Sequence, residues 1–186
     1  MIKTLYLIRH CSAAGQEPDA PLTEEGARQA EDLANWLTGK GIESIISSPY
    51  SRAYNSILPF SQRQGLTIHT DDRLVERALC AGTLPDWRDR LAETFEDLDL
   101  RLQGGETSRA AMARASAVVN EAISGACHTI ILVTHGNLLT LLLKHFDGAF
   151  GFEDWQRMTN PDVYKVAFLP DTDPVVQRIK IRLTEG

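Results

Sequence analysis

The chain alternates between two patterns of apolar and polar positions. Short runs of β-branched and other apolar residues predict buried strands, which lie at 2–8, 44–47, 66–70, 129–133, 163–168 and 175–181. Between them, apolar residues recur every three or four positions and predict helices at 24–37, from about 50, at 86–97, at 107–124 and after 137. Strands that alternate with helices are typical of a mostly parallel sheet covered on both faces. We therefore expect an α/β three-layer sandwich.

Local signals indicate where several of these helices begin or end. Thr23 can cap a helix whose first turn is acidic, a charge that suits the positive end of the helix dipole. A Gly-Gly pair breaks the chain just before the helix that begins near Thr107. Pro59 lies inside the helix expected from about position 50, and proline lacks the N–H of a helical hydrogen bond. We expect Pro59 to kink or end that helix.

Composition and charge narrow the class of protein. The 186 residues, of which 43% are hydrophobic, fit one ordinary core, so we expect a single domain over 1–186. A formal net charge of -6 repels polyanions and disfavours a general binder of nucleic acid or of acidic membranes. The longest apolar run, 138–143, is too short to cross a bilayer.

The cysteines point to a reducing compartment. Three of them, Cys11, Cys80 and Cys127, lie far apart and without the spacing of a zinc site. No basic, apolar and small-residue series resembling a signal peptide precedes the first strand. These features predict a cytoplasmic protein with reduced thiols, and the sequence leaves its oligomeric state open.

Arginine and histidine side chains lie at the ends of two of the predicted strands. Arg9 and His10 end the first strand, and His135 follows the strand at 129–133. The carboxyl ends of parallel strands lie along one edge of the sheet, where open α/β sheets bind ligands. Arg52 joins them if the strand at 44–47 ends at the same edge. Because a guanidinium group can bind two phosphate oxygens at once (bidentate binding), we expect an anion site there.

Five motifs, in order along nearly the whole chain, resemble the histidine phosphatase superfamily. They are Leu-Ile-Arg-His at 7–10, Pro-Leu-Thr-Glu-Glu-Gly at 21–26, Ser-Ser-Pro-x-x-Arg-Ala at 47–53, Gly-Gly-Glu-Thr at 104–107 and Val-Thr-His-Gly-Asn at 133–137. The superfamily includes the cofactor-dependent phosphoglycerate mutases and broad-specificity acid phosphatases. The resemblance implies a phosphoglycerate mutase-like fold.

The resemblance also implies roles for the polar residues at the strand ends. His10 would be the nucleophile that forms a phosphohistidine, with Arg9, Arg52 and His135 around the transferred phosphoryl group. Neutral imidazole attacks phosphorus well near neutral pH, and arginines stabilise the charge on the phosphoryl oxygens without a metal. We therefore expect no metal and no cofactor. The arginines should also disfavour protonation of His10.

A leaving alkoxide needs a proton, and the resemblance places the acid in a Leu-x-Glu context. Glu76 matches that context. Ignoring the family, Glu76 could equally be a surface carboxylate paired with Arg73 or Arg77. The nearest alternative acids are Asp71, Asp72 and Glu106.

The loop after His10 departs from the family pattern. Cys11 stands where the family has glycine, and two alanines stand where it often has a hydroxyl residue and an asparagine that contacts phosphate. We expect Ser12 and Gln16 to replace these substrate contacts. Nearby cations should lower the pKa of the Cys11 thiol and make it sensitive to peroxide.

The leading functional hypothesis is a phosphatase for small phosphomonoesters, with no nucleic-acid or membrane partner. A mutase must keep its phosphohistidine dry and retain its product, which normally needs more chain than this. Three alternatives stay open: phosphoglycerate mutase-type transfer, a phosphohistidine protein phosphatase, and a non-enzymatic phosphate sensor. Neither Gly-x-Ser-x-Gly nor Gly-x-Gly-x-x-Gly occurs, so a serine hydrolase or a dinucleotide enzyme has no support.

Overall fold

The computed structural model describes residues 2–184 and contains a mixed sheet in the order β3-β2-β4-β1-β5-β6. The strands are β1 (Lys3–Arg9), β2 (Ser44–Ser47), β3 (Ile68–Thr70), β4 (Thr129–Thr134), β5 (Asp162–Phe168) and β6 (Val175–Ile179). The pairs β1–β4, β2–β4 and β2–β3 are parallel. The pairs β1–β5 and β5–β6 are antiparallel. The parallel part therefore brings the carboxyl ends of β1, β2 and β4 to one edge.

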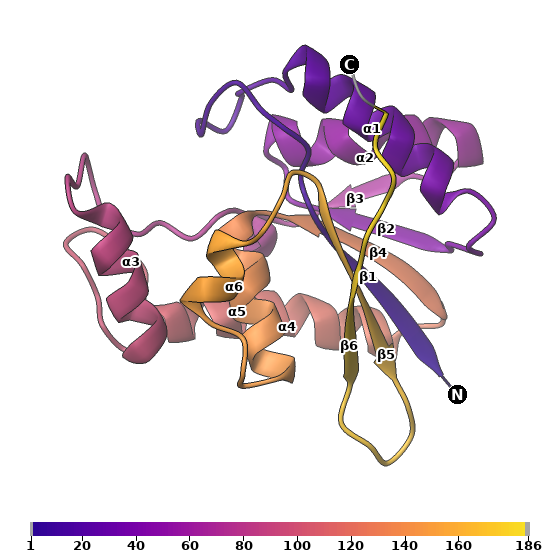
Figure 1. Cartoon of the computed structure of the whole chain (residues 1–186). Helices are drawn as coiled ribbons and strands as arrows, with labels where there is room; N and C mark the ends of the chain where they lie inside the picture. The colour runs from indigo at the N-terminus through magenta and orange to yellow at the C-terminus, as the bar shows by residue number, and fades with distance from the viewer. Residues whose placement is uncertain (1, 185–186) are drawn as a thin grey trace.

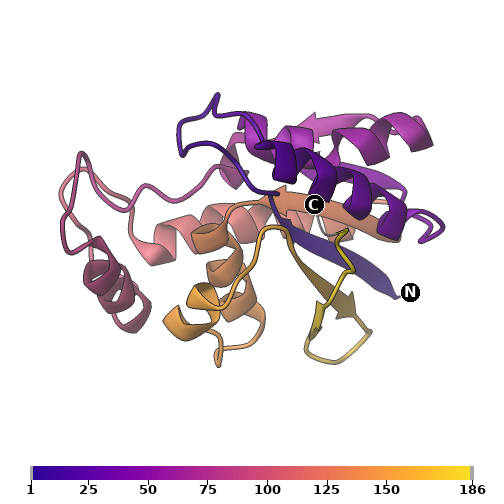
Figure 2. The same ribbon diagram turned by 45° about the horizontal axis from the view of Figure 1, so that its top comes forward.

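Helices cover both faces of this sheet, which confirms the expected α/β three-layer arrangement (Figure 1). They are α1 (Glu24–Leu37), α2 (Ser51–Gln64), α3 (Trp87–Glu96), α4 (Ser108–Ser124), α5 (Gly136–Phe146) and α6 (Phe152–Gln156), with a 3-10 turn η1 (Asp72–Leu74). Figure 2 shows α1 and α2 on one face and α4 to α6 on the other. Within residues 2–184, no helix is long and apolar enough to cross a membrane.

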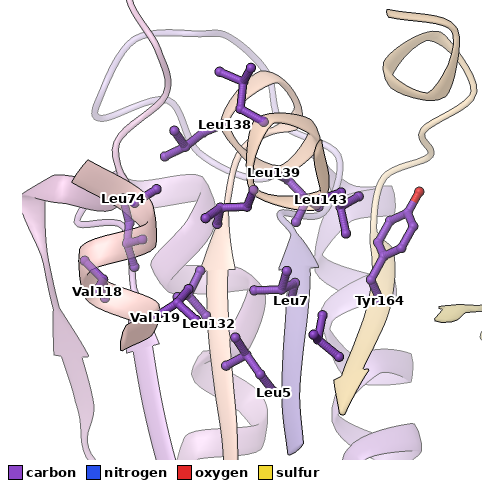
Figure 3. Close-up of a cluster of buried hydrophobic side chains, with 14 of the residues drawn as sticks. Leu5, Leu7, Leu74, Val118, Val119, Leu132, Leu138, Leu139, Leu143 and Tyr164 are labelled. Atoms are coloured by element: carbon purple, nitrogen blue, oxygen red, sulfur yellow. The ribbon is translucent and has the colours of Figure 1, made fainter. Parts of the chain in front are cut away.

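The side chains of the central strands alternate between two cores. Leu5 and Leu7 of β1 pack with Leu132 of β4 under α4 and α5 (Figure 3). Tyr6 and Ile8 point to the opposite face, where they pack beneath α1 and α2. Burial on both faces explains why β1 and β4 read as nearly continuous apolar runs.

The predicted helix starts agree with the capping contacts. The Thr23 hydroxyl accepts a hydrogen bond from the N–H of Gly26 at 3.0 Å, and the Thr107 hydroxyl accepts one from the N–H of Ala110 at 3.0 Å. Each contact satisfies an N–H that has no partner inside its helix. These two threonines thus set the starts of α1 and α4.

Of the two outcomes expected at Pro59, a kink or an end of the helix, the end does not occur, because α2 continues through Pro59 to Gln64. Proline inside a helix removes one backbone hydrogen bond and costs about 3 kcal/mol. Ile57 and Phe60, on either side of Pro59, are fully buried against the core beneath α1 and α2. Their burial offsets that cost and keeps the segment helical.

The segment 79–105 carries α3 and lies away from the sheet (Figure 1). It meets the rest of the molecule partly through α6, where Trp87 contacts Trp155 and Phe95 contacts Phe152. The short helix α6 was not predicted from the sequence. Together α3 and α6 stand beside the edge at which β1 and β4 end.

Candidate active site

The parallel pairing of β1 and β4 brings two histidines together. Arg9, the last residue of β1, pairs in register with Thr134, the last residue of β4. The next residue in each chain segment is a histidine, and the rings of His10 and His135 lie with their centroids 5.2 Å apart. The sheet edge thus holds two imidazoles side by side, almost entirely buried.

Arg52 reaches the same point from the first turn of α2, directly after β2. Its side chain is buried, and its Nε donates to Nε2 of His10 at 3.3 Å. Its Nη1 donates to the carbonyls of Gln16 and Glu17 at 3.0 and 2.8 Å. These carbonyls belong to the loop after β1, so Arg52 ties that loop to the sheet edge and fixes its own guanidinium beside His10.

The hydrogen bonds of His10 define its tautomer. Nδ1 lies 2.7 Å from the carbonyl oxygen of Cys11, which can only accept, so Nδ1 carries the proton. Nε2 is then unprotonated, and its lone pair accepts the hydrogen bond from Nε of Arg52. Burial, helped by the charges of Arg52 and Arg9 and opposed by the Cys11 carbonyl, lowers the pKa of His10 from 6.5 to about 4. At neutral pH His10 is therefore an uncharged base whose Nε2 lone pair accepts the N–H of Arg52.

Arg9 lies flat against Gly136, the first residue of α5. A Cβ at position 136 would lie 3.1 Å from Nε of Arg9, so a larger residue would push the guanidinium away. On its other side Arg9 donates through Nη1 to the carbonyls of Met158 and Thr159 at 3.3 and 3.4 Å. Burial lowers the pKa of Arg9, but an arginine stays charged.

His135 is fully buried, and its Nε2 lies 2.8 Å from Oγ of Ser48, which follows β2. Burial, and after it the nearby His10, Arg52 and Arg9, lower the pKa of His135 well below its ordinary value. His135 is thus neutral at pH 7 and held by Ser48. Ser48 belongs to the Ser-Ser-Pro-x-x-Arg-Ala motif, but nothing in the sequence indicates its contact with His135.

Buried polar atoms without a partner gather at this edge of the sheet. Across residues 2–184 such side-chain atoms are Arg9 Nε, Arg77 Nη2, His135 Nδ1 and Asn137 Oδ1. Buried polar groups are nearly always hydrogen-bonded, so an exception needs an explanation. Arg9 ends β1, His135 directly follows β4, and Asn137 lies in the first turn of α5 beside them. Of these atoms Nε of Arg9 can donate to an anion, whereas Oδ1 of Asn137 can only accept, so the edge suits a ligand with both acceptor and donor groups.

A cavity of about 460 Å³ opens onto His10. Its lining residues are Arg9, His10, Gln16, Glu76, Leu79, Trp87, Leu91, Gly136, Asn137 and Trp155. Gln16, expected at the substrate, lies in this lining, whereas Ser12 does not. The backbone N–H of Ser12 instead donates to Gln29 at 2.9 Å, and its carbonyl accepts from the N–H of Thr23 at 3.1 Å. Ser12 therefore joins the loop to α1 rather than facing the cavity.

Glu76 faces the cavity and is anchored by backbone groups. Its carboxylate accepts from the N–H groups of Asn137 and Leu138 at the start of α5, at 3.0 and 2.9 Å, and from the N–H of Arg77 at 2.9 Å. The alternative of a surface carboxylate paired with Arg73 or Arg77 is wrong. The Arg77 side chain turns to Glu106 and Thr94, and that of Arg73 to Asp71 and Glu121.

The alternative acids lie elsewhere. Asp71 forms an ion pair with Arg73 at 2.7 Å, and Glu106 forms one with Arg114 at 2.8 Å. Hydrogen bonding to Arg73 lowers the pKa of Asp71, which keeps it ionised. Asp72 is exposed, and none of these three carboxylates lines the cavity. Glu76 is the carboxylate that the fold places beside His10.

The expectation of a reactive Cys11 is wrong. The thiol is fully buried in the core beneath α1 and α2, and burial raises its pKa to about 12. Only the main chain of Cys11 takes part in the site: its carbonyl accepts from His10, and its N–H donates to Oγ of Ser56 at 2.7 Å. A hydrophobic side chain thus faces the core while its carbonyl orients the imidazole.

Comparison with known proteins agrees with this geometry. Residues 5–180 match the model of the histidine phosphatase superfamily (branch 1). A probable phosphoglycerate mutase, GpmB, of Yersinia pestis (strain Pestoides F) is 31% identical over 160 residues, which cover 75% of this chain and 73% of the relative.

Two solved structures share the fold and confirm the phosphoglycerate mutase-like class. A mycobacterial glucosyl-3-phosphoglycerate phosphatase in complex with inorganic phosphate superposes with a TM-score of 0.77 at 24% identity, covering 96% of each chain. YhfR of Bacillus stearothermophilus superposes with a TM-score of 0.74 at 23% identity, covering 95% of this chain and 96% of the other.

Proposed function

The chain belongs to branch 1 of the histidine phosphatase superfamily, and from that premise we propose that it hydrolyses small phosphomonoesters through a phosphohistidine on His10. One observation carries the proposal. His10, Arg9 and Glu76 line one cavity, and Nε of Arg52 reaches Nε2 of His10 at 3.3 Å from beside it. A nucleophile, a cation that can bind a phosphoryl group and a carboxyl group for proton transfer thus share one pocket, with a second cation in contact with the nucleophile.

In the first step, Nε2 of His10 attacks phosphorus while the bond from phosphorus to the leaving oxygen breaks. Arg9 and Arg52 stabilise the charge on the phosphoryl oxygens, and Nδ1 of His135 is free to contact one of them. The leaving oxygen takes the departing electron pair and a proton from Glu76.

In the second step, water attacks the phosphohistidine. The phosphorus–nitrogen bond breaks, its electron pair returns to Nε2, and Glu76, now a carboxylate, takes the proton from the water. Inorganic phosphate leaves, and both residues return to their first state. His10 keeps its Nδ1 proton throughout, because the Cys11 carbonyl binds it.

Hydrolysis fits the pocket better than a mutase reaction, which must exclude water from the phosphohistidine. A second cavity, of about 400 Å³, adjoins the first and shares Arg9 and Trp155 with it. Two neighbouring cavities give water a route to phosphorus. Mutase-type transfer is the second candidate, and the 31% identical relative named as a probable phosphoglycerate mutase favours it.

We propose further that the reaction needs no metal or cofactor, since Arg9 and Arg52 supply the positive charge. Within the described part of the chain, no three His, Cys, Asp or Glu side chains cluster in a way that could hold a metal ion. The free thiols of Cys11, Cys80 and Cys127 support our proposal that the protein works in the cytoplasm.

The experiment is to trap the phosphoenzyme. During turnover of para-nitrophenyl phosphate in EDTA, the wild type should carry an acid-labile, alkali-stable phosphoryl label, and His10→Ala should carry none. His69→Ala, which removes an exposed histidine on β3, is the matched control and should label normally. Turnover with no label, or full activity in His10→Ala, would refute the phosphohistidine. Absence of turnover would favour a sensor, and 3-phosphoglycerate isomerisation faster than hydrolysis would favour a mutase.

A further inference from the structure

The cavity beside His10 has a polar end and an apolar wall. Its hydrogen-bonding side chains, among them Arg9 and Glu76, gather at the strand ends, where the phosphoryl group would bind. The apolar wall consists of Leu79, Leu91 and two tryptophans from α3 and α6. Ligand pockets typically pair an apolar lining for the body of a ligand with a few polar groups that fix its orientation.

The two tryptophans form a defined pair. Trp87 of α3 and Trp155 of α6 meet edge to face, with ring centroids 5.7 Å apart and an interplanar angle of 90°. Trp155 is held from behind, because Phe152 stacks on it with centroids 5.5 Å apart. Arg88 lies 5.2 Å from the centre of the Trp87 ring. The pair is thus a preformed aromatic surface rather than two independent side chains.

Part of this surface is left in water. Trp87 is 39% exposed, although it also lines the cavity and contacts Trp155. An apolar ring that reaches the cavity from the substrate side would bury more of Trp87 and Trp155. A short hydroxylated group would leave both rings exposed to water and would find only the indole N–H groups as hydrogen-bond donors on that wall.

From this placement we infer that the aromatic wall, Trp87 with Trp155, selects phosphomonoesters whose organic group ends in an aromatic ring. The inference rests on the proposed function, which puts the phosphoryl group at His10. The ring packs against the tryptophans while the ester oxygen lies near Glu76. Trp87 and Trp155 are then specificity-determining residues that take no part in bond making.

A pair of substrates with nearly equal leaving groups tests this inference. We expect 2-phenylethyl phosphate to be hydrolysed with a kcat/KM higher than that of ethyl phosphate by about 10–200-fold, the range that apolar pockets achieve. Trp87→Ala should lower this ratio toward one, and Trp87→Phe should retain much of it. Trp36→Phe, on α1 against Tyr6 and Lys40, is the control and should leave the ratio unchanged. Equal kcat/KM values in the wild type, or an unchanged ratio in Trp87→Ala, would overturn the inference.

A binding experiment separates this inference from the proposed function. In Trp36→Phe all tryptophan fluorescence comes from the aromatic wall, because the chain has only three tryptophans. Titration with the non-hydrolysable 2-phenylethylphosphonate should change the emission and saturate at lower concentration than ethylphosphonate. This result would support binding of the aromatic ring by Trp87 and Trp155 even if no phosphomonoester were hydrolysed. Equal affinities would overturn it even if the phosphatase reaction were established.

Discussion

His10 links the stability of the fold to pH. Its pKa is about 4 in the folded protein against an ordinary 6.5, so between these values the unfolded chain binds a proton that the folded chain does not. The free energy of unfolding therefore falls as pH drops from 6.5 to 4, and the contribution of His10 does not change above 6.5. At roughly 1.4 kcal/mol per pKa unit, the full effect is about 3–4 kcal/mol.

Urea unfolding of the wild type and His10→Asn, at about pH 7.5 and about pH 4.5, checks this prediction. The loss of stability between the two pH values should be smaller in the variant. The acidic groups contribute equally to both proteins, whereas His135 is coupled to His10, so the difference reports the titration of His10 together with its effect on His135. Identical losses would show that His10 titrates normally in the folded state.

Glu76 should matter in proportion to how poorly the substrate's oxygen leaves. General acid catalysis contributes about 10²–10⁴-fold, so Glu76→Gln should slow phosphoryl transfer from alkyl phosphates by an amount in this range. Para-nitrophenyl phosphate, whose leaving group needs little protonation, should be affected much less. Single-turnover kinetics on the two substrates measures the first step alone. Equal losses on both would assign Glu76 to positioning Asn137 and Leu138, whose N–H groups it accepts from.

Site residues that act through their side chains could be predicted from the sequence. Residues that contribute through backbone hydrogen bonds could not. His10 and His135 end predicted strands, so the pattern alone indicated that they meet. The position of Glu76 depended on the resemblance, since a Leu-x-Glu sequence has no periodicity that points it into a cavity. Cys11 and Ser12 were misjudged because their carbonyls and N–H groups make the contacts, and residue type says little about backbone geometry.

At the scale of elements, the loop between α6 and β5 forms hydrogen bonds with Arg9 and His10. Carbonyls of Met158 and Thr159 accept from Arg9, and Nδ2 of Asn160 donates to the carbonyl of His10 at 2.7 Å. The buried carboxylate of Asp162 holds this loop, because it accepts from the N–H of Thr159 at 3.1 Å. It is itself fixed by Arg178 of β6, at 2.6 Å.

We therefore expect Arg178 to be a positioning residue. Arg178→Gln should lower kcat for phosphoryl transfer by up to about 10²-fold, since small misplacements of catalytic groups have effects of this size. Arg178→Lys should restore part of the activity by keeping the charge beside Asp162. Arg157→Gln is the control, because it breaks only an exposed ion pair with Glu153. Its free energy of unfolding should stay within about 1 kcal/mol of the wild-type value. Normal kcat in Arg178→Gln would contradict the positioning role.

The elements themselves were mostly predictable, and the exceptions have physical causes. Helices such as α1 and α4 combine an apolar stripe with a threonine cap, so two independent signals agreed. The helix α6 is only five residues long, too short for periodicity to reveal it. Apolar runs predicted the strands β5 and β6, but strand direction depends on the connection and leaves no mark in an apolar run.

At the scale of the whole molecule, phosphate should stabilise the fold. A ligand that binds only the folded state at 100 times its Kd stabilises by about 2.7 kcal/mol, which for 150–250 residues raises Tm by about 5–10 °C. Thermal unfolding with increasing inorganic phosphate measures the shift. Arg52→Ala should abolish it, whereas Arg63→Ala, on the exposed side of the same helix, should keep it. An equal shift in both variants would place phosphate elsewhere.

A protein with a net charge of -6 can hold a cationic site because its positive and negative side chains lie in different places. Arg9 and Arg52 lie at the edge of the sheet among buried groups, while most acidic side chains lie on the surface. The pocket therefore attracts a small anion although the molecule as a whole repels polyanions.

That the 186 residues form one domain remains a prediction from length.

The central place of β1 has a consequence for how the protein acquires its activity during synthesis. Thr4 pairs with Thr129 on one side and with Ala167 on the other, so both neighbours of the strand that carries His10 come from far along the chain. A ribosome must complete β4 before β1 has any partner, and β5 before it has both. Until β4 is made, the apolar strand β1 is unpaired. Such long-range pairing slows folding and exposes nascent chains to aggregation. The nucleophile is translated early but becomes functional among the last groups to do so.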